Sequence, residues 1–267
     1  MLELGVFSWF GYPAPFERRL GLIKQAGFES TCLWLGDEEE EVRAGRADSM
    51  PSLVQEKGLV LDNAHAPYKN CNRLWSASAT DVQEAVAEYR TCLLFCRNHA
   101  IRTMVMHITE GEDPPPFNAR GLSAIEDIAK LAESCGVVLA LENTRRSDYL
   151  DAVFSNLGSP SIGFCYDSSH DFMADKSKGR ILQRWGHLLA ATHLSDSRQG
   201  DTDDHLVPEE GTIDWAEIGR PFRESNYERT LMLEVDGSSS AGSLPPVEFL
   251  TRCYRWLGEF RETLRNK

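Results

Sequence analysis

Eight short apolar runs recur along the chain and alternate with segments whose apolar residues repeat every three to four positions. Short apolar runs are typical of strands buried in a parallel sheet, and the second pattern is typical of amphipathic helices. The predicted strands occupy residues 2–9, 30–35, 59–66, 102–108, 137–144, 161–167, 188–196 and 229–236. Helical periodicity is clearest in residues 79–99, 122–136 and 245–264, and the last of these segments begins with proline, as first helical turns often do.

The spacing of these runs predicts the fold. Successive strands lie roughly thirty residues apart, which is the length of a βαβ unit. Eight such units in 267 residues match the size of a (β/α)8 TIM barrel. A doubly wound open sheet is the alternative, but the GxGxxG turn expected after its first strand is missing. Because we find no linker, we predict that residues 1–267 form one α/β domain, a single (β/α)8 TIM barrel.

Polar residues end most of the predicted strands, at the edge where TIM barrels carry their active sites. These residues and those in the following loops are His65, His107, Glu142, Asp167, His170, His193, Asp203, His205 and Glu234. An unpaired carboxylate is costly to bury, and several carboxylates at one barrel mouth would repel one another. A divalent cation removes both costs, and Asp, Glu and His are its usual ligands. We therefore predict a metal site formed by Glu142, Asp167, His193 and Glu234.

Each of these residues also has an ordinary interpretation when it is taken alone. A single acidic residue at a strand end often caps a helix or joins a salt bridge, and a single histidine is often a hydrogen-bonded core residue. The joint pattern favours the metal site, because only two of the seven histidines, His99 and His187, lie away from the predicted mouth. We interpret those two histidines as structural.

Composition and charge narrow the functional classes further. The formal net charge of −13 disfavours nonspecific binding to nucleic acid or to an anionic membrane. No apolar run approaches the ~20 residues of a membrane span, and the N-terminus lacks the basic start of a signal peptide. The seven cysteines are scattered without a CxxC pair, as expected of reduced thiols in a cytoplasmic protein.

Five motifs resemble the xylose isomerase-like TIM-barrel superfamily, which contains sugar phosphate isomerases and epimerases as well as endonuclease IV-type nucleases. They are LALENT, CYDSSH, THLSDS, DDHLVPEEGTIDW and MLEV, and all lie between residues 139 and 235. For the isomerase and epimerase branch, the resemblance implies one Mn²⁺, Mg²⁺, Co²⁺ or Zn²⁺ ion on Glu142, Asp167, His193 and Glu234. It also implies that Glu142 and Glu234 move the carbon-bound proton of a sugar or sugar phosphate, while the ion acts as a Lewis acid that stabilises an enediolate.

The same resemblance implies residues that touch the sugar. The family has an acid six positions after the first glutamate, a histidine three positions after the aspartate and an arginine after the seventh strand. Their counterparts here are Asp148, His170 and Arg198. Asp148 replaces a glutamate of the ketose 3-epimerases and Arg198 is offset in spacing, so the reaction within this branch stays open. Trp9 and Trp34 could also wall the sugar, or could simply pack the end of the barrel.

The alternative function is that of a multinuclear zinc hydrolase. Endonuclease IV-type enzymes hold three zinc ions with nine ligands, and a bridging hydroxide attacks the phosphodiester. All nine ligand types have a counterpart here: His65, His107, Glu142, Asp167, His170, His193, Asp203, His205 and Glu234. The tyrosine three residues after the first histidine is also present, as Tyr68.

An acidic run disfavours this hydrolase. Asp37–Glu41 lie on the mouth side of the barrel, where a DNA-binding enzyme needs Lys and Arg. The run could also be the solvated start of a helix. We therefore favour a sugar isomerase or epimerase. His65, His107, His170, Asp203 and His205 are then further ligands of metal or substrate.

Two weaker signals concern the substrate. The loop DGSSSAGS, residues 236–243, follows the eighth strand, where TIM barrels often bind phosphate, although such loops are more often simply flexible. Arg145 and Arg146 could bind an acidic substrate or pair with nearby carboxylates. No GxSxG, Walker or HExxH motif is present. We expect a small sugar as the partner, not nucleic acid or a membrane, and a homo-oligomer is also open.

Overall fold

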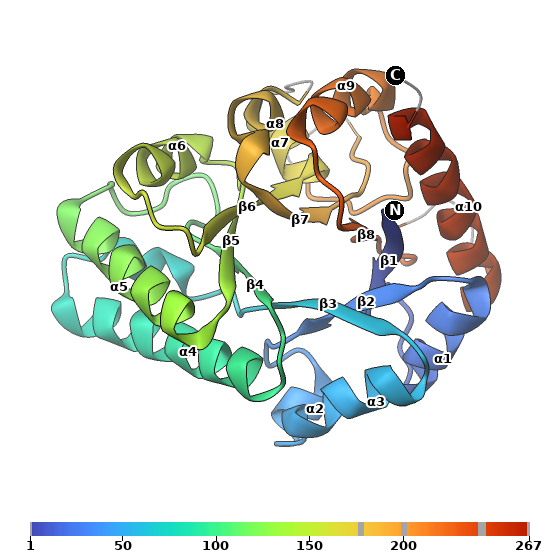
Figure 1. Cartoon of the computed structure of the whole chain (residues 1–267), viewed down its shortest axis with the longest axis horizontal. Coiled ribbons are helices and arrows are strands. Elements are labelled where there is room, and N and C mark those ends of the chain that lie inside the picture. Colours follow the sequence, from blue (N-terminus) through green and yellow to red (C-terminus); the bar gives the residue numbers. More distant parts are fainter. Residues whose placement is uncertain (1, 176–178, 199–201, 240–243, 266–267) are drawn as a thin grey trace.

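The computed structural model describes residues 2–175, 179–198, 202–239 and 244–265. Within these ranges, eight parallel strands form one sheet in the order β7-β6-β5-β4-β3-β2-β1-β8. The strands are β1 Glu3–Phe7, β2 Ser30–Trp34, β3 Val60–His65, β4 Thr103–His107, β5 Val138–Glu142, β6 Ile162–Asp167, β7 Leu189–His193 and β8 Thr230–Leu233. A parallel bridge between Leu194 and Leu233 closes the sheet, and the resulting ring is visible in Figure 1. The prediction of a TIM barrel is confirmed.

Helices follow every strand and surround the ring (Figure 1). They are α1 Phe16–Ala26, α2 Glu40–Arg43, α3 Met50–Glu56, α4 Ala79–Asn98, α5 Ala119–Cys135, α6 Ser147–Asn156, α7 Ser168–Asp175, α8 Arg180–Trp185, α9 Trp215–Ser225 and α10 Pro246–Arg265, with short 3-10 turns at η1 Ala47–Ser49, η2 Cys71–Trp75 and η3 Gly186–Leu188. The three helices that the sequence predicts most clearly, α4, α5 and α10, begin and end close to their predicted bounds. In the described part of the chain, no helix is long and apolar enough to cross a membrane.

Local sequence explains where the longest of these helices begin and end. The Ser78 side chain accepts a hydrogen bond from the backbone N–H of Asp81 at the start of α4, and Asn118 accepts one from Gly121 at the start of α5. Such caps satisfy N–H groups that have no partner within the helix. Gly136 ends α5 in the left-handed conformation, at φ 67°, which glycine adopts without strain.

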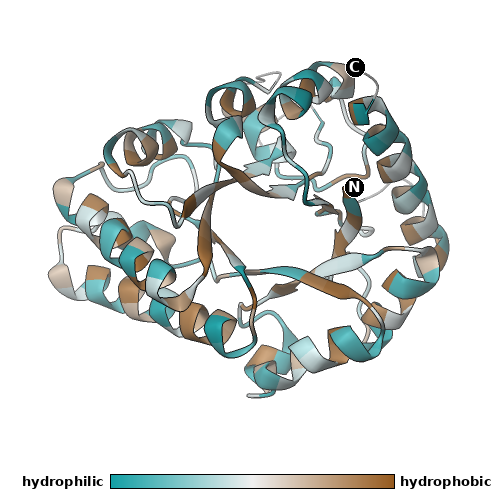
Figure 2. Ribbon diagram, in the orientation of Figure 1, coloured by the Kyte–Doolittle hydropathy of each residue, from teal (hydrophilic) through white to brown (hydrophobic). Residues whose placement is uncertain are grey.

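Side chains of the strands alternate between two apolar layers, because successive residues of a strand point to opposite faces. One set packs against the helices, and Leu4, Val6, Leu139 and Leu141 belong to it. The other set fills the barrel with small clusters that include Val105, Ala140, Cys165, Ala191, Cys32 and Met232. Figure 2 shows hydrophobic residues along the strands and mixed faces on the helices.

The alternation of side chains along the strands also determines which residues project into the mouth of the barrel. Ala140, Cys165 and Ala191 are buried inside the barrel, and two positions later their strands reach Glu142, Asp167 and His193. Residues two apart in a strand share a face. The polar strand ends therefore project into the barrel mouth above an apolar interior.

Gly5 tests how tightly this interior is packed. A Cβ atom there would lie 2.7 Å from Ser30 Oγ and 2.8 Å from both Met232 Cε and Thr230 Cγ2. We expect Gly5→Ala to lower the free energy of unfolding by about 1–3 kcal/mol, because the added methyl group overpacks the barrel. Gly21 in α1 has no neighbour within 4 Å of such an atom, so Gly21→Ala should raise stability by about 0.4–1 kcal/mol. Urea denaturation measures both variants, and equal effects would contradict the packing argument.

Candidate metal centre and substrate cleft

The strand ends converge on one cluster at the mouth of the barrel. His65, His107, Glu142, Asp167 and His193 are the last residues of β3 to β7, and Glu234 directly follows β8. In a TIM barrel the carboxyl ends of all strands meet at one rim. Potential ligand atoms of Glu142, Asp167, His193 and Glu234 accordingly lie within 4.8 Å of one another. The structure thus brings together the four residues that the sequence predicts to bind a metal.

Several buried atoms of this cluster have no hydrogen-bond partner among the described residues. They are Glu142 Oε1, Asp167 Oδ2 and both ring nitrogens of His193. His193 Nδ1 lies within ion-pair distance of two carboxylates, 3.1 Å from Glu142 Oε2 and 3.0 Å from Glu234 Oε2. Buried polar atoms without partners are rare in folded proteins. A divalent cation would accept lone pairs from all four side chains, so the donor set fits a metal ion.

Neighbouring hydrogen bonds orient these side chains, as is usual around metal ligands. The backbone N–H of His170 donates to Asp167 Oδ1 at 2.6 Å. The Asn143 side chain accepts from the Asp167 backbone N–H and donates to its carbonyl, both at 2.8 Å. Asn143 is a residue of the site that the pattern of polar strand ends does not predict, although its place beside Glu142 in LALENT is a signal for it.

Burial and neighbouring charges act differently on the two deepest carboxylates. Burial raises the pKa of Asp167 to about 7, and Glu142 adds to this rise although His170 opposes it. Burial also favours the neutral form of Glu142, but His193 and His107 outweigh it and hold the pKa of Glu142 well below its usual value. Asp167 is thus the carboxylate whose charge the surrounding side chains compensate least, and a bound cation would compensate it.

Glu142 also lies at the centre of a second group of potential ligands. His65 Nε2 lies 3.1 Å and His107 Nε2 lies 3.4 Å from Glu142 Oε2, and the ligand atoms of all three are within 4.8 Å of one another. Burial lowers the pKa of His107, but Glu142 and Glu110 outweigh burial and raise it to about 9. Glu110 lies 3.2 Å from His107 Nδ1. The pattern of polar strand ends does not predict this contact, because Glu110 lies three residues beyond the end of β4.

Asp203 joins the remaining two histidines on the loop side of the mouth. Its Oδ2 atom lies 3.0 Å from His170 Nε2 and 2.9 Å from His205 Nε2. The Ser169 hydroxyl donates to Asp203 Oδ1 at 2.8 Å. Burial lowers the pKa of His205, but Asp203 outweighs burial and raises it to about 10. All five additional candidates therefore lie in this polar network, and their binding of metal or substrate stays a prediction.

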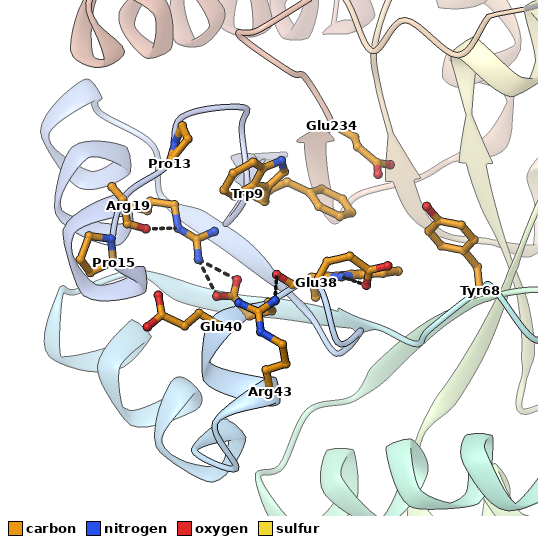
Figure 3. A pocket seen from close by; sticks show the side chains of 13 residues that line it. Trp9, Pro13, Pro15, Arg19, Glu38, Glu40, Arg43, Tyr68 and Glu234 are labelled. Atoms are coloured by element: carbon orange, nitrogen blue, oxygen red, sulfur yellow. Dashed lines mark hydrogen bonds and ion pairs between the residues drawn. The ribbon is translucent and has the colours of Figure 1, made fainter.

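A cleft of about 660 Å³ opens beside the metal centre, and Figure 3 shows the side chains that line it. Glu234 and Phe7 lie at its inner end, and the Phe7 ring is 4.8 Å from that of His193. Trp34 packs 4.9 Å from the His65 ring. Trp9 is 43% exposed. Both tryptophans that the sequence analysis proposed as a sugar wall thus line the cleft, and their contact with substrate stays a prediction.

Asp148 and the two arginines that precede it in the sequence, Arg145 and Arg146, form ion pairs with nearby residues. Asp148, in the first turn of α6, accepts two hydrogen bonds from Arg146, at 2.8 and 2.7 Å, and its side chain is 63% exposed. Arg145 lies 3.1 Å from Glu112. Of the two sequence interpretations for these arginines, the structure therefore supports pairing with nearby carboxylates. The contacts described for Asp148 do not join it to the metal centre, so its role in substrate binding stays a prediction.

Arg198 lies on the loop after β7, as expected. Its backbone N–H donates to Asp204 at 3.2 Å, and its Nη2 donates to the Ser239 carbonyl at 3.4 Å. The second half of the 236–243 loop, residues 240–243, lies outside the described residues, so phosphate binding by that loop is not tested.

The acidic run Asp37–Glu41 is only partly solvated. Asp37, Glu38 and Glu40 are exposed, but Glu39 is 4% exposed. Both Glu39 carboxylate oxygens lie 2.7 Å from Arg19 Nη2. The interpretation of the run as a solvated helix start is wrong for Glu39, because a partner on another helix neutralises and buries it.

The two histidines predicted to be structural lie outside the cluster. His99 Nε2 is 2.8 Å from Asp48 Oδ1, and its ring packs 4.5 Å from that of Phe95. His187 packs 6.0 Å from the Trp185 ring. Their contacts agree with a structural role.

A family model, curated proteins and solved structures were each found to be similar to this chain. A family model described as xylose isomerase-like TIM barrel matches residues 20–254. The D-psicose 3-epimerase of Enterocloster bolteae is 26% identical over 256 residues, which cover 85% of this chain and 78% of that protein. A solved L-ribulose 3-epimerase superposes with a TM-score of 0.79 at 17% identity, covering 99% of this chain and 96% of the other. D-psicose 3-epimerase from Clostridium cellulolyticum H10 gives 0.74 at 17% identity, covering 98% and 99%.

Asp167→Asn tests the metal centre directly. The amide loses the negative charge but can still accept the His170 N–H, so we expect the affinity for Mn²⁺ to fall by about 100-fold or more. The metal-free variant should be at least as stable as the wild type, because burial already disfavours the charged form of Asp167. Calorimetric titration of metal-free protein measures the affinity, with Asp148→Asn as the control. Wild-type Mn²⁺ affinity in Asp167→Asn would contradict this site.

Proposed function

Because this chain belongs to the xylose isomerase-like TIM barrel family, we propose that it is a divalent-metal-dependent enzyme that epimerises or isomerises a small sugar. The observation that carries this proposal is the pair of carboxylates around one histidine nitrogen. Glu142 and Glu234 lie 3.1 and 3.0 Å from His193 Nδ1, so two groups that can exchange protons flank one position beside the cleft. The D-psicose 3-epimerases among its relatives support the same class of reaction.

Glu142, Asp167, His193 and Glu234 would hold one ion per chain. When bound, a divalent ion would supply Lewis acidity that polarises a carbonyl group of the substrate. Carboxylate and imidazole ligands suit Mn²⁺, Mg²⁺, Co²⁺ or Zn²⁺.

The two glutamates differ in their access to the cleft. The Glu234 side chain is 23% exposed and that of Glu142 is 1% exposed, and Glu234 lines the cleft. Burial favours the neutral form of Glu234, but His193 outweighs burial and lowers its pKa. The neighbouring histidine thus favours the carboxylate form of both glutamates, which is the form that accepts a proton from the carbon beside a carbonyl group. One glutamate, as a carboxylate, removes the proton. In isomerisation it returns that proton to the next carbon. In epimerisation the other glutamate first takes up a proton from solvent in the cleft and gives it to the opposite side of the same carbon, and the first glutamate then releases its proton to solvent.

Aromatic side chains shield the inner end of the cleft. Phe7 packs edge-on against His193, and Trp34 packs against both His65 and Tyr68, at 4.9 and 5.4 Å. These rings limit the access of bulk water to the two glutamates, which strengthens the electrostatic interactions of both carboxylates with a bound substrate.

We also propose that the enzyme works in the cytoplasm. All seven cysteines are free, and six of them are buried. An oxidising compartment favours disulfides, and burial raises the pKa of the Cys165 thiol to about 12, which keeps this thiol unreactive.

One observation favours the multinuclear zinc hydrolase as a second candidate. Glu142 belongs both to the four-residue metal centre and to the group with His65 and His107, and a carboxylate shared in this way can bridge two ions. Asp203 joins two further histidines in the same network. The exposed acids Asp37, Glu38 and Glu40 near the mouth would nevertheless repel a DNA backbone.

Metal content separates the two candidates. We expect elemental analysis of protein purified without chelator or nickel resin to find one divalent ion per chain. Removal of that ion with EDTA should abolish exchange of the substrate C–H proton with solvent, and Mn²⁺ should restore it. Two or three tightly held zinc ions, together with cleavage of abasic DNA, would contradict the epimerase proposal and support the hydrolase.

Substitution of the glutamates tests the proton transfer. We expect Glu234→Gln and Glu142→Gln to slow deuterium exchange into ketohexoses in D₂O by about 10²–10⁴-fold, because an amide cannot accept the proton. NMR measures the exchange, and Glu112→Gln, which alters an exposed ion pair with Arg145, is the control. The metal content of each variant is measured on the same sample. A Glu234→Gln protein that retains metal and wild-type exchange would contradict the role of Glu234.

A further inference from the structure

The cleft extends well beyond the place where a single sugar would react. From Glu234 and Tyr68 it reaches Glu40 and Arg43 on α2 (Figure 3). Its volume is about 660 Å³. Pockets of about 300–1,000 Å³ enclose drug-sized ligands, whereas a single hexose has only about a dozen heavy atoms. A hexose held at the metal centre would leave the outer half of the cleft unfilled.

The outer half has an aromatic surface. Trp9, which follows β1 two residues after Phe7, is 43% exposed, one of three large exposed hydrophobic side chains in the described part of the chain. The guanidinium of Arg19 packs 5.3 Å from the centre of the Trp9 ring, and this contact holds the indole at the cleft. One face of a sugar ring carries mainly C–H groups, so an exposed indole beside a reaction site is a suitable surface for a second sugar ring.

The charges around the cleft disfavour an anionic ligand. Four glutamates and two arginines line it: Glu38, Glu39, Glu40, Glu234, Arg19 and Arg43. The arginines are already engaged. Arg19 donates to both oxygens of Glu39 and to the carbonyls of Ser8 and Ala14, and its side chain is 3% exposed.

Arg43 points back at the backbone of the acidic run. Its Nη1 donates to the carbonyls of Asp37 and Glu38, at 2.9 and 3.1 Å. Glu38 is engaged as well, because one of its oxygens pairs with Lys69 and the other accepts the indole N–H of Trp34. The Glu40 side chain is 68% exposed and remains beside the cleft, where its carboxylate accepts hydrogen bonds from hydroxyl groups and repels phosphate.

We propose that the outer half of the cleft is a second sugar subsite, and that the preferred substrate is a neutral ketose carrying a glycosidic second ring, not a free or phosphorylated hexose. This inference rests on the proposed function. The reacting ketose lies at Glu234, the second ring packs on Trp9, and its hydroxyls donate to Glu40.

Three probes test the subsite, because they share a fructose unit and differ only at O6. They are fructose, fructose 6-phosphate and isomaltulose, which carries a glucosyl ring at O6. Deuterium exchange into the fructose unit is followed by NMR with the Mn²⁺-loaded protein. We expect a KM for isomaltulose about tenfold below that of fructose, and a KM for fructose 6-phosphate above that of fructose.

The possible outcomes test the proposed subsite separately from the proposed reaction. If the protein exchanges deuterium into fructose, and the KM for fructose is equal to or below the KM for isomaltulose, the subsite proposal is overturned. The proposed function is then left intact. A preference for fructose 6-phosphate also overturns the subsite proposal. No exchange into any of the three probes or into the other ketohexoses overturns the proposed function and this inference with it.

Variants locate the effect within the cleft. Trp9→Ala should bring the ratio of the two KM values to about one, whereas Trp9→Phe should retain most of the preference for isomaltulose. Phe117→Ala is the matched control, because Phe117 is a similarly exposed ring, at 39%, packed against Trp75 on another surface. The substitution Glu40→Gln should lower the KM for fructose 6-phosphate, because it removes an exposed negative charge beside the cleft. An unchanged KM ratio in Trp9→Ala would contradict stacking on Trp9.

Discussion

The contacts that four histidines make with the carboxylate of Glu142 organise the mouth of this barrel. His65, His107, His170 and His193 all approach Glu142 to within 3.4 Å. They come from β3, β4, the first turn after β6, and β7. A carboxylate that is 1% exposed requires positive partners or a cation, since a buried charge without them is strongly destabilising. The strands around Glu142 are therefore electrostatically coupled, and a change at one strand end alters the ionisation of the others.

The rest of the barrel provides the space and the rigidity that these contacts need. Small side chains fill the interior below the mouth, so bulky polar side chains fit above them. The long loop after β7 is anchored by Asp196, which is fully buried and accepts the backbone N–H groups of Ser197, Glu209 and Ile213 and the indole N–H of Trp215. This anchoring holds Asp203 and His205 against the candidate metal ligands, although both lie in irregular structure.

One ligand set of this kind is compatible with more than one reaction, because function depends on the site and its surroundings more than on the fold. The centre itself, with its carboxylates and imidazoles, suits both proton transfer and hydrolysis. The cleft distinguishes them: its aromatic walls and its exposed glutamates suit a neutral polyhydroxylated ligand and oppose a polyanion. The surroundings of the metal centre therefore carry most of the information about the substrate.

The sequence alone was sufficient to predict the barrel and the identity of the residues at its mouth. Strand alternation and strand length are local properties, so the runs ending in His65, His107, Glu142, Asp167 and His193 could be recognised without tertiary information, and a parallel barrel must then bring those ends to one rim. The contacts between distant residues could not be recognised in this way. The burial of Glu39 by Arg19, the pairing of Asp148 with Arg146 and the exposure of Trp9 beside the cleft depend on side-chain orientation and on how helices and loops pack. These features were decided only by the tertiary structure, because an ion pair or a cleft depends on distances between elements that no local pattern encodes.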